Sequence, residues 1–172
     1  MRGQNEVLQN DIAQAQKSGK EYYRDADERL KKLEPQKMMI EGREGLVQPT
    51  EKSDYDAALK VFRDGDYKGA QASFQSFARR YPNSVYLPLA AFWSGNAACA
   101  LKDYKTAIPI MQDMIKVYPD HPKVAEAMLV IANSQLESNQ KAPAKKAYQD
   151  LVAKYPDSEA GGIAKQRLTT IK

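Results

Sequence analysis

The apolar residues in the last two thirds of the chain recur with a fixed period. The segments "RRYP", "KVYP" and "AKYP" place tyrosines at 81, 118 and 155, which are 37 residues apart. At the same interval, small residues align with small ones, large apolar residues with large apolar ones, and proline with proline. A period between 20 and 50 residues is typical of a solenoid built from stacked units. The aligned columns are Ala58/Gly95/Ala132, Ala70/Ala107/Ala144, Phe74/Met111/Tyr148, Phe77/Met114/Leu151 and Pro82/Pro119/Pro156.

Each unit predicts two helices joined by a short turn. In the segment "YKGAQASFQSFARRY", the residues Ala70, Phe74, Phe77 and Tyr81 succeed one another at spacings of 4, 3 and 4, which is the spacing of an amphipathic helix. The segment "DYDAALKVFRDG" predicts the helix before it, and "DGDY", "LKDY" and "SNQK" predict the turns. We therefore predict an all-α fold with units at about 55–84, 88–121 and 125–158, ended by a capping helix at 159–172.

The first 34 residues predict one continuous helix without a core of its own. Its apolar residues lie along a heptad seam that polar residues such as Asn5 and Arg29 interrupt. An isolated helix of this kind is marginally stable in water, so we predict that residues 1–34 form an oligomerising coiled coil. The alternative is a single solvated helix. The predicted oligomerisation seam consists of Leu8, Ile12, Ala15, Tyr22, Ala26 and Leu33.

Residues 35–54, "PQKMMIEGREGLVQPTEKSD", show no clear periodicity. Pro35 ends the first helix, and Gly42, Gly45 and Pro49 interrupt the segment after it. Glycine and proline at this density are typical of loops. We predict a flexible linker between the N-terminal helix and a repeat domain over 55–172.

Charge and composition argue against several functions. The net charge is +4, with −1 on residues 1–54 and +5 on residues 55–172. A concentrated basic patch or a known nucleic-acid-binding module is missing, so we predict no nucleic-acid partner. No segment approaches the roughly 20 apolar residues that a membrane-spanning helix needs.

The sequence also lacks the residues of an enzyme. His121 is the single histidine and stands between two prolines, in what we predict to be an exposed loop. No His, Cys or carboxylate lies near it at metal-ligand spacing, and no nucleophile or phosphate-binding motif is present. The single cysteine, Cys99, stands among alanines and is predicted to be a buried apolar residue. We predict no catalytic residues, no metal and no cofactor.

A short helical solenoid presents a concave surface to a partner. Asn96 and Asn133 stand one period apart on the predicted groove side, and their amides could bind the backbone of an extended peptide because each offers a donor and an acceptor. The alternative is that both amides are merely solvated. The predicted groove residues are Tyr55, Leu59, Phe62, Arg63, Leu89, Phe92, Asn96, Glu126, Leu129 and Asn133.

The columns resemble the tetratricopeptide repeat. In that family a small residue is followed by an alanine after 12 positions, an aromatic residue after 4 more and a proline after a further 8. Gly95, Ala107, Met111 and Pro119 show these intervals, and the other two units keep them. The unit of 37 residues is longer than the usual length of about 34.

The order of segments resembles one family more closely. The stretches "RGQNEVLQNDI" and "YYRDADERLKKLE", then a polar linker, then "YDAALKVFRDGDYKGAQASFQSFARRYPNS" and two more units are similar to the Tol-Pal-associated family called YbgF or CpoB. Members of that family carry a signal peptide and further residues before the part that matches "RGQ". The resemblance therefore implies that this chain begins inside the coiled coil.

The resemblance implies a periplasmic, non-enzymatic adaptor of cell division. Its coiled coil would form a homotrimer, and its repeats would bind TolA. It would coordinate outer-membrane constriction by the Tol-Pal system with septal peptidoglycan synthesis by a bifunctional penicillin-binding protein. Two alternatives remain: a periplasmic repeat scaffold for outer-membrane protein assembly, and a module that binds an anionic envelope polymer.

Overall fold

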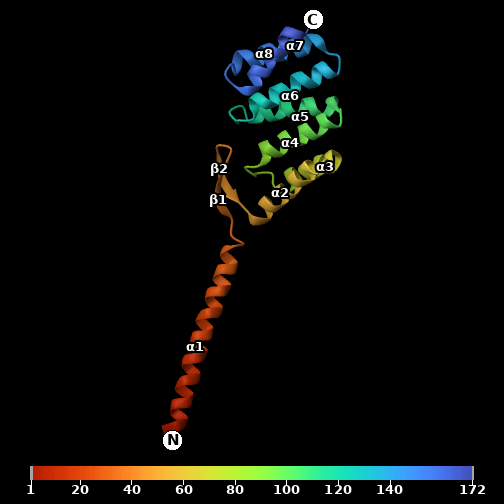
Figure 1. The fold of residues 1–172 in the computed structure, drawn as a ribbon. Helices are drawn as coiled ribbons and strands as arrows, with labels where there is room; N and C mark the ends of the chain where they lie inside the picture. The colour runs from red at the N-terminus through yellow and green to blue at the C-terminus, as the bar shows by residue number, and fades with distance from the viewer. Residues whose placement is uncertain (1, 172) are drawn as a thin grey trace.

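The chain folds into a long helical arm, a β-hairpin and a stack of helices. The computed structural model describes residues 2–171, and the side chains of residues 9 and 11–171. Figure 1 shows helix α1 (Arg2–Lys31) extending away from the rest of the chain. Strands β1 (Gln36–Ile40) and β2 (Arg43–Val47) come next, beside the first helices of the stack.

Seven helices form the stack, and each packs on its neighbours in sequence. The predicted all-α repeat fold is confirmed, with the hairpin as its only non-helical element among the described residues. Helix α8 packs on α7 and α6 and covers the C-terminal end of the array. The helices are α2 (Pro49–Arg63), α3 (Tyr67–Arg80), α4 (Leu87–Ala100), α5 (Tyr104–Val117), α6 (Val124–Glu137), α7 (Lys141–Lys154) and α8 (Glu159–Thr170).

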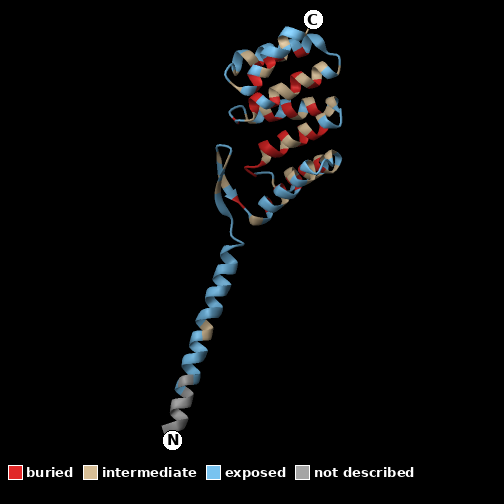
Figure 2. Cartoon of the chain, viewed as in Figure 1, coloured by how far each residue is buried: buried red, intermediate tan, exposed pale blue. Residues whose placement is uncertain are grey.

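The aligned columns form the core. Ala70, Ala107 and Ala144 are completely buried, and Figure 2 shows the buried residues along the inner faces of the stacked helices. Gly95 faces Met111, since a Cβ atom at Gly95 would lie 2.8 Å from the Met111 Cε atom. Small residues in these columns let helices approach closely, and large ones fill the space between units.

The repeated tyrosine-proline pair stands at the end of the second helix of each unit. Tyr81, Tyr118 and Tyr155 are the C-cap residues of α3, α5 and α7, and each donates its backbone N–H to a carbonyl four residues earlier. The proline after each tyrosine cannot continue a helix. The motif thus has a structural role.

In the turn inside each unit, the residue at one position of the repeat has a left-handed backbone conformation. Gly65, Lys102 and Asn139 stand 37 residues apart and have φ angles of +86°, +60° and +61°. Glycine adopts this conformation freely and asparagine tolerates it, whereas lysine is strained there. One of the three turns therefore carries a residue that its backbone disfavours.

Residues 35–54 differ from the flexible linker that we predicted. They contain an antiparallel hairpin in which Met39 pairs with Glu44 and Ile40 with Arg43, and α2 begins at Pro49 rather than at 55. The turn residues Glu41 and Gly42 both have positive φ angles, as a two-residue hairpin turn requires. The pair Glu-Gly is a weaker signal for such a turn than Asn-Gly or Asp-Gly, and the strands are only five residues long.

The hairpin packs on the stack through one face. Val47 is 2 % exposed, and Met38 and Ile40 pack against the core of the first unit. Gly45 lies against the side chain of Val85, in the loop before α4, so closely that a Cβ atom would collide with it. The Arg43 guanidinium carbon lies 4.6 Å from the centre of the Tyr118 ring, in the loop before α6. The hairpin is therefore joined to two inter-repeat loops.

Helix α1 has a different environment. Nearly all of its described side chains are exposed, and three ion pairs between residues four apart lie along its last turns: Arg24–Glu28, Asp25–Arg29 and Asp27–Lys31. Such pairs stabilise a helix by only about 0.3–0.5 kcal/mol each. Neither α1 nor any other described helix has the length and apolar character that crossing a membrane requires.

We expect Lys102→Gly to stabilise the repeat domain. The change removes the left-handed strain at this turn. Glycine also raises the entropy of the unfolded chain, and after this cost is subtracted the free energy of unfolding should increase by about 0.5–1 kcal/mol. Urea unfolding monitored by circular dichroism measures the change. Gly65→Lys is the matched variant and should be destabilising, and an unchanged or lower stability of Lys102→Gly would contradict the prediction.

Candidate partner-binding groove

A groove lies on the side of the array formed by the first helices of units two and three. It has a volume of about 330 Å³ and runs between α4, α6 and α8. Its walls come from the loops before α6 and α8 as well as from the helices. The lining residues are Phe92, Asn96, Pro122, Ala125, Glu126, Leu129, Val130, Asn133, Ser158, Glu159, Ala160 and Ile163.

The structure brings five of the ten predicted groove residues together here. They are Phe92, Asn96, Glu126, Leu129 and Asn133, all from units two and three. The sequence reasoning missed the contribution of α8 and of the loop before it, namely Ser158, Glu159, Ala160 and Ile163. The 37-residue period could have predicted the contribution of α8, because Ile163 stands one period after the predicted groove residue Glu126.

The residues predicted from the first unit do not line this groove. Tyr55 is only 5 % exposed and stacks on Tyr86, with 4.4 Å between the ring centres. Burial raises the pKa of Tyr55 to about 12. Leu89 is also buried. Tyr55 and Leu89 therefore belong to the core of the first unit and do not line the groove.

The three remaining predicted groove residues lie at the edge of that core. Leu59 and Phe62 are partly buried against it, and the Phe62 ring lies 5.0 Å from the ring of Trp93. Arg63 is exposed. None of the three lines the groove of units two and three.

One column of the repeat differs in size from unit to unit beside the first helices, in line with the position of the groove toward the C-terminal end. Tyr86, Lys123 and Ala160 stand one period apart. Tyr86 covers Tyr55, and the Lys123 ammonium lies 5.7 Å from the centre of the Phe92 ring. The small Ala160 leaves space in the third unit, where it lines the groove. The size of this residue decides how much of each unit a partner could reach.

The two amides are held in complementary orientations. Asn96 donates an Nδ2–H to the Phe92 carbonyl at 2.9 Å, which leaves its Oδ1 atom as an acceptor. The Tyr148 hydroxyl donates to Asn133 Oδ1 at 2.5 Å, which leaves the Nδ2 hydrogens as donors. Tyr148 is completely buried, and burial raises the pKa of its hydroxyl. Asn96 thus keeps its Oδ1 acceptor and Asn133 keeps its Nδ2–H donors, the two kinds of group that pair with a peptide backbone.

The groove is acidic at its rim, although the repeat domain is basic overall. Glu126 forms an ion pair with Lys123 at 2.7 Å. Glu159 stands in the first turn of α8 and has no ion pair among those of the described residues. The floor of the groove is apolar, with Leu129, Val130 and Ile163. An uncharged or basic segment would suit these surroundings better than an acidic one.

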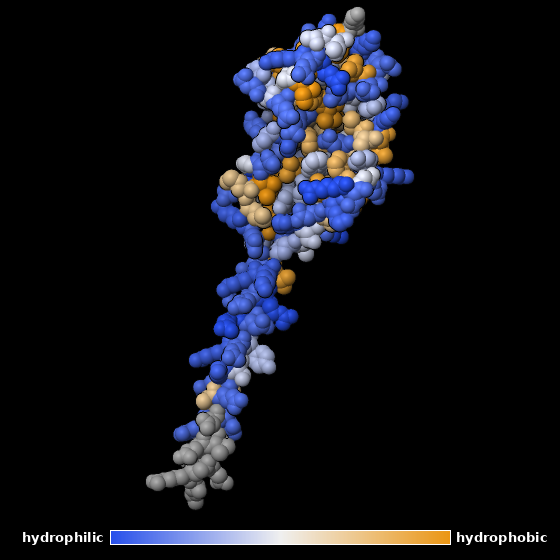
Figure 3. Space-filling view, in the orientation of Figure 1, coloured by the Kyte–Doolittle hydropathy of each residue, from blue (hydrophilic) through white to orange (hydrophobic). Residues whose placement is uncertain are grey.

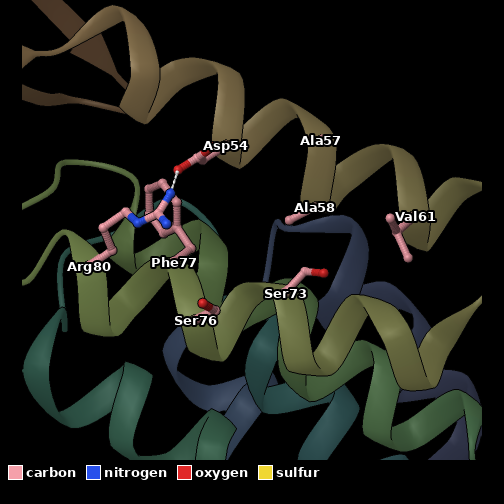
Figure 4. A pocket seen from close by; sticks show the side chains of 8 residues that line it. All are labelled: Asp54, Ala57, Ala58, Val61, Ser73, Ser76, Phe77 and Arg80. Atoms are coloured by element: carbon pink, nitrogen blue, oxygen red, sulfur yellow. Dashed lines mark hydrogen bonds and ion pairs between the residues drawn. The ribbon is translucent and has the colours of Figure 1, made fainter.

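A second pocket lies at the opposite end of the array, between α2 and α3. Figure 4 shows its lining, with Ala57, Ala58 and Ser73 along the helices and the Asp54–Arg80 ion pair at one end. Asp54 Oδ2 accepts hydrogen bonds from Tyr81 Oη at 2.8 Å and from Arg80 Nη1 at 2.6 Å. The hydrogen bonds from Tyr81 and Arg80 lower the pKa of Asp54. None of the predicted groove residues lines this pocket.

His121 is placed differently from the exposed loop position that we predicted. It is 6 % exposed and lines a pocket together with the hairpin residues Glu41 and Arg43. Its Nδ1 atom accepts the backbone N–H of Lys123 at 3.2 Å, much as Ser84, one period earlier, accepts the N–H of Tyr86. Burial lowers the pKa of His121. The histidine therefore has a structural role in the turn before α6.

Cys99, the single cysteine, is partly buried. The Ser134 hydroxyl donates to its Sγ atom at 3.6 Å. Within the part of the chain that the structure describes, no three His, Cys, Asp or Glu side chains are grouped as metal ligands would be.

The predicted oligomerisation seam is exposed wherever the structure describes it. Ile12, Ala15, Tyr22, Ala26 and Leu33 are exposed, while the side chain of Leu8 lies outside the described residues. Figure 3 shows mostly hydrophilic side chains along the arm, with apolar ones at intervals.

Two exposed residues of α1 were missing from the predicted seam. Tyr23 is 82 % exposed and Leu30 is 61 % exposed. At 3.6 residues per turn, they lie with Ile12 and Tyr22 in an arc of about 100°. The apolar stripe of the arm is thus wider than the heptad seam.

The helical hairpins, their 37-residue columns and the groove between first helices define a protein of the tetratricopeptide-repeat class. The outer membrane lipoprotein family YfiO matches residues 48–172. The chain therefore belongs to that family.

Individual relatives agree with this class. The "Cell division coordinator CpoB" of Pseudomonas putida is 40 % identical over 53 residues, a segment that covers 31 % of this chain and 20 % of the relative. The predicted resemblance to the YbgF/CpoB family is confirmed by this match, and the chain spans about a fifth of the length of the relative.

Solved structures with similar folds have low sequence identity. MamA from Desulfovibrio magneticus RS-1 has a TM-score of 0.59 at 21 % identity, over 70 % of this chain and 63 % of MamA. The second TPR domain of the human RPAP3 protein, in complex with the HSP70 peptide SGPTIEEVD, has a TM-score of 0.58 at 15 % identity, over 70 % of this chain and 93 % of that domain. These structures confirm the fold.

We expect Asp54→Asn to destabilise the protein in a pH-dependent way. The carboxylate form is favoured in the folded state, so its contribution is present at neutral pH and is lost as pH falls through the folded pKa. Because Asp54 is partly exposed, the difference from the wild type at pH 7 should be at most about 1 kcal/mol. It should shrink below about pH 4.

Urea unfolding at several pH values measures this difference. Asp150→Asn is the control, since Asp150 is exposed and has no ion pair among the described residues. A difference for Asp54→Asn that stays constant from pH 7 to pH 3 would contradict the prediction.

Proposed function

We propose that the protein is a periplasmic adaptor that binds TolA through its repeat groove. In this role it connects outer-membrane constriction by the Tol-Pal system to septal peptidoglycan synthesis by a bifunctional penicillin-binding protein during cell division. The groove between α4, α6 and α8 carries the proposal, because it combines an apolar floor with two oriented amides. The name of the CpoB relatives, cell division coordinator, supports the process.

The groove would hold an extended or helical segment of TolA without any chemical step. Asn96 Oδ1 would accept a hydrogen bond from the partner, and Asn133 Nδ2 would donate one. Leu129, Val130 and Ile163 would bury an apolar side chain of the bound segment. Glu159 would favour a basic residue next to it.

Self-association would add avidity to this recognition. Three repeat domains on a trimeric α1 coiled coil would raise the effective concentration of grooves near a multivalent partner, without any new contact. The exposed apolar stripe on α1 supports this arrangement.

A second candidate function has one observation in its favour. The matching family is described as an outer membrane lipoprotein, which supports a scaffold for outer-membrane protein assembly. Binding of purified TolA distinguishes the two functions.

The third alternative, binding of an anionic envelope polymer, predicts an affinity that falls steeply with salt. The affinity of groove recognition should change little with salt.

We expect the double variant Asn96→Ala, Asn133→Ala to bind TolA more weakly. Loss of two hydrogen bonds should cost about 1–3 kcal/mol, which raises Kd by a factor of roughly 5 to 150. Titration calorimetry measures the affinity. Circular dichroism and urea unfolding show whether the fold persists, because Asn133→Ala also removes the partner of Tyr148.

The matched control for this pair is Asn83→Ala, an exposed asparagine outside the groove. It should leave Kd unchanged. Undiminished affinity of the double variant would rule out the groove as the site, and no binding of TolA by the wild type would rule out the proposed partner.

We expect deletion of residues 1–34 to convert an oligomer into a monomer. The described apolar side chains of α1 that are exposed in one chain would be buried between chains in the oligomer. Sedimentation equilibrium gives the mass of both proteins. The repeat domain should keep its helical circular dichroism, and a full-length chain that is already monomeric would contradict the prediction.

A further inference from the structure

The β-hairpin has two faces of different character. One face packs on the helical stack through Met38, Ile40 and Val47. The other, which we call the outer hairpin face, consists of Lys37, Met39, Glu44 and Leu46. All four are exposed, and the pairing places Lys37 opposite Leu46 and Met39 opposite Glu44.

The outer hairpin face exposes two large apolar side chains. Met39 is 69 % exposed and Leu46 is 70 % exposed. They lie diagonally across the two strands, and the Lys37–Glu44 ion pair occupies the other diagonal. The inner face already holds the hairpin on the stack, so Met39 and Leu46 form a small apolar surface that is available to a partner.

Exposed apolar residues are concentrated in the N-terminal part of the chain. Of the nine large hydrophobic side chains that are exposed among the described residues, seven lie between residues 12 and 46. Only four residues separate the end of α1 at Lys31 from the start of β1 at Gln36. Leu30 and Leu33 at the end of the arm and Met39 and Leu46 on the hairpin are all exposed.

We infer that the outer hairpin face binds the same face of other copies of this chain. The inference rests on the self-association that we propose for α1, because chains joined along α1 hold their hairpins close together. The face carries one cation and one anion. Lys37 of one chain can therefore pair with Glu44 of another while Met39 and Leu46 are buried between them.

This contact determines how the grooves are oriented. The inner face of the hairpin is held by Val85 and Tyr118 in two inter-repeat loops. Hairpins that pair at their outer faces would therefore fix the repeat domains relative to one another and to the arm. The oligomer would present its grooves at defined positions instead of on free tethers.

Disulfide trapping tests the contact in the full chain. In a Cys99→Ser background, Met39→Cys and Leu46→Cys should form cross-linked dimers under mild oxidation. Leu101→Cys is the control, since Leu101 is also an exposed large apolar residue but lies on the helical stack. Cross-linking at positions 39 and 46 that does not exceed the control would overturn the inference.

A second pair of variants measures the contribution of the face. Met39→Lys with Leu46→Lys should raise the dissociation constant of the oligomer at least about tenfold, because two apolar side chains are no longer buried. Leu101→Lys should leave it unchanged. If the wild type is an oligomer and Met39→Lys with Leu46→Lys leaves its dissociation constant unchanged, the hairpin contact alone is overturned. A monomeric wild type would overturn the α1 assembly as well.

Discussion

The solenoid depends on the close approach of its helices at two columns of small residues. Ala70, Ala107 and Ala144 have no exposed surface, and Gly95 gives Met111 the space that a Cβ atom would occupy. Larger side chains in these columns would force the helices apart and open the core. The large residues Phe74, Met111 and Tyr148 then fill the space between units, so each unit supports the next. The groove exists because this stacking places α4, α6 and α8 side by side.

The groove differs from unit to unit because one column changes size. Tyr86 closes the first unit over Tyr55, and Lys123 lies above Phe92 in the second. Ala160 leaves the third unit open. A repeat architecture would otherwise offer three equivalent surfaces. This single column therefore changes how far the first helix of each unit is covered, while the core columns keep the same kinds of residue.

The hairpin changes the relation between the arm and the repeats. A flexible linker would let the two move independently, but Gly45 and Arg43 contact loops that precede α4 and α6. The hairpin also lies beside His121, whose Nδ1 atom holds the turn before α6. The end of the arm is thereby placed next to the loop edge of the stack, where the loops before α6 and α8 also border the groove.

Local sequence patterns predicted much of this structure. The 37-residue columns identified the buried faces of α3, α5 and α7. They succeeded because helix periodicity depends on residues a few positions apart. The same columns placed Phe92, Asn96, Glu126, Leu129 and Asn133 on one surface.

Contacts between distant residues decided the rest. Tyr86 buries Tyr55 from 31 positions away, and Tyr148 turns the amide of Asn133 from a different helix. The hairpin depends on a Glu-Gly turn and on packing against Val85, neither of which has a strong periodic signal. The sequence by itself determined the repeat, its helices and its core. Only the tertiary structure decided which predicted groove residues line the groove and which hydrogen-bonding groups they present, because these depend on neighbours that the chain brings together only on folding.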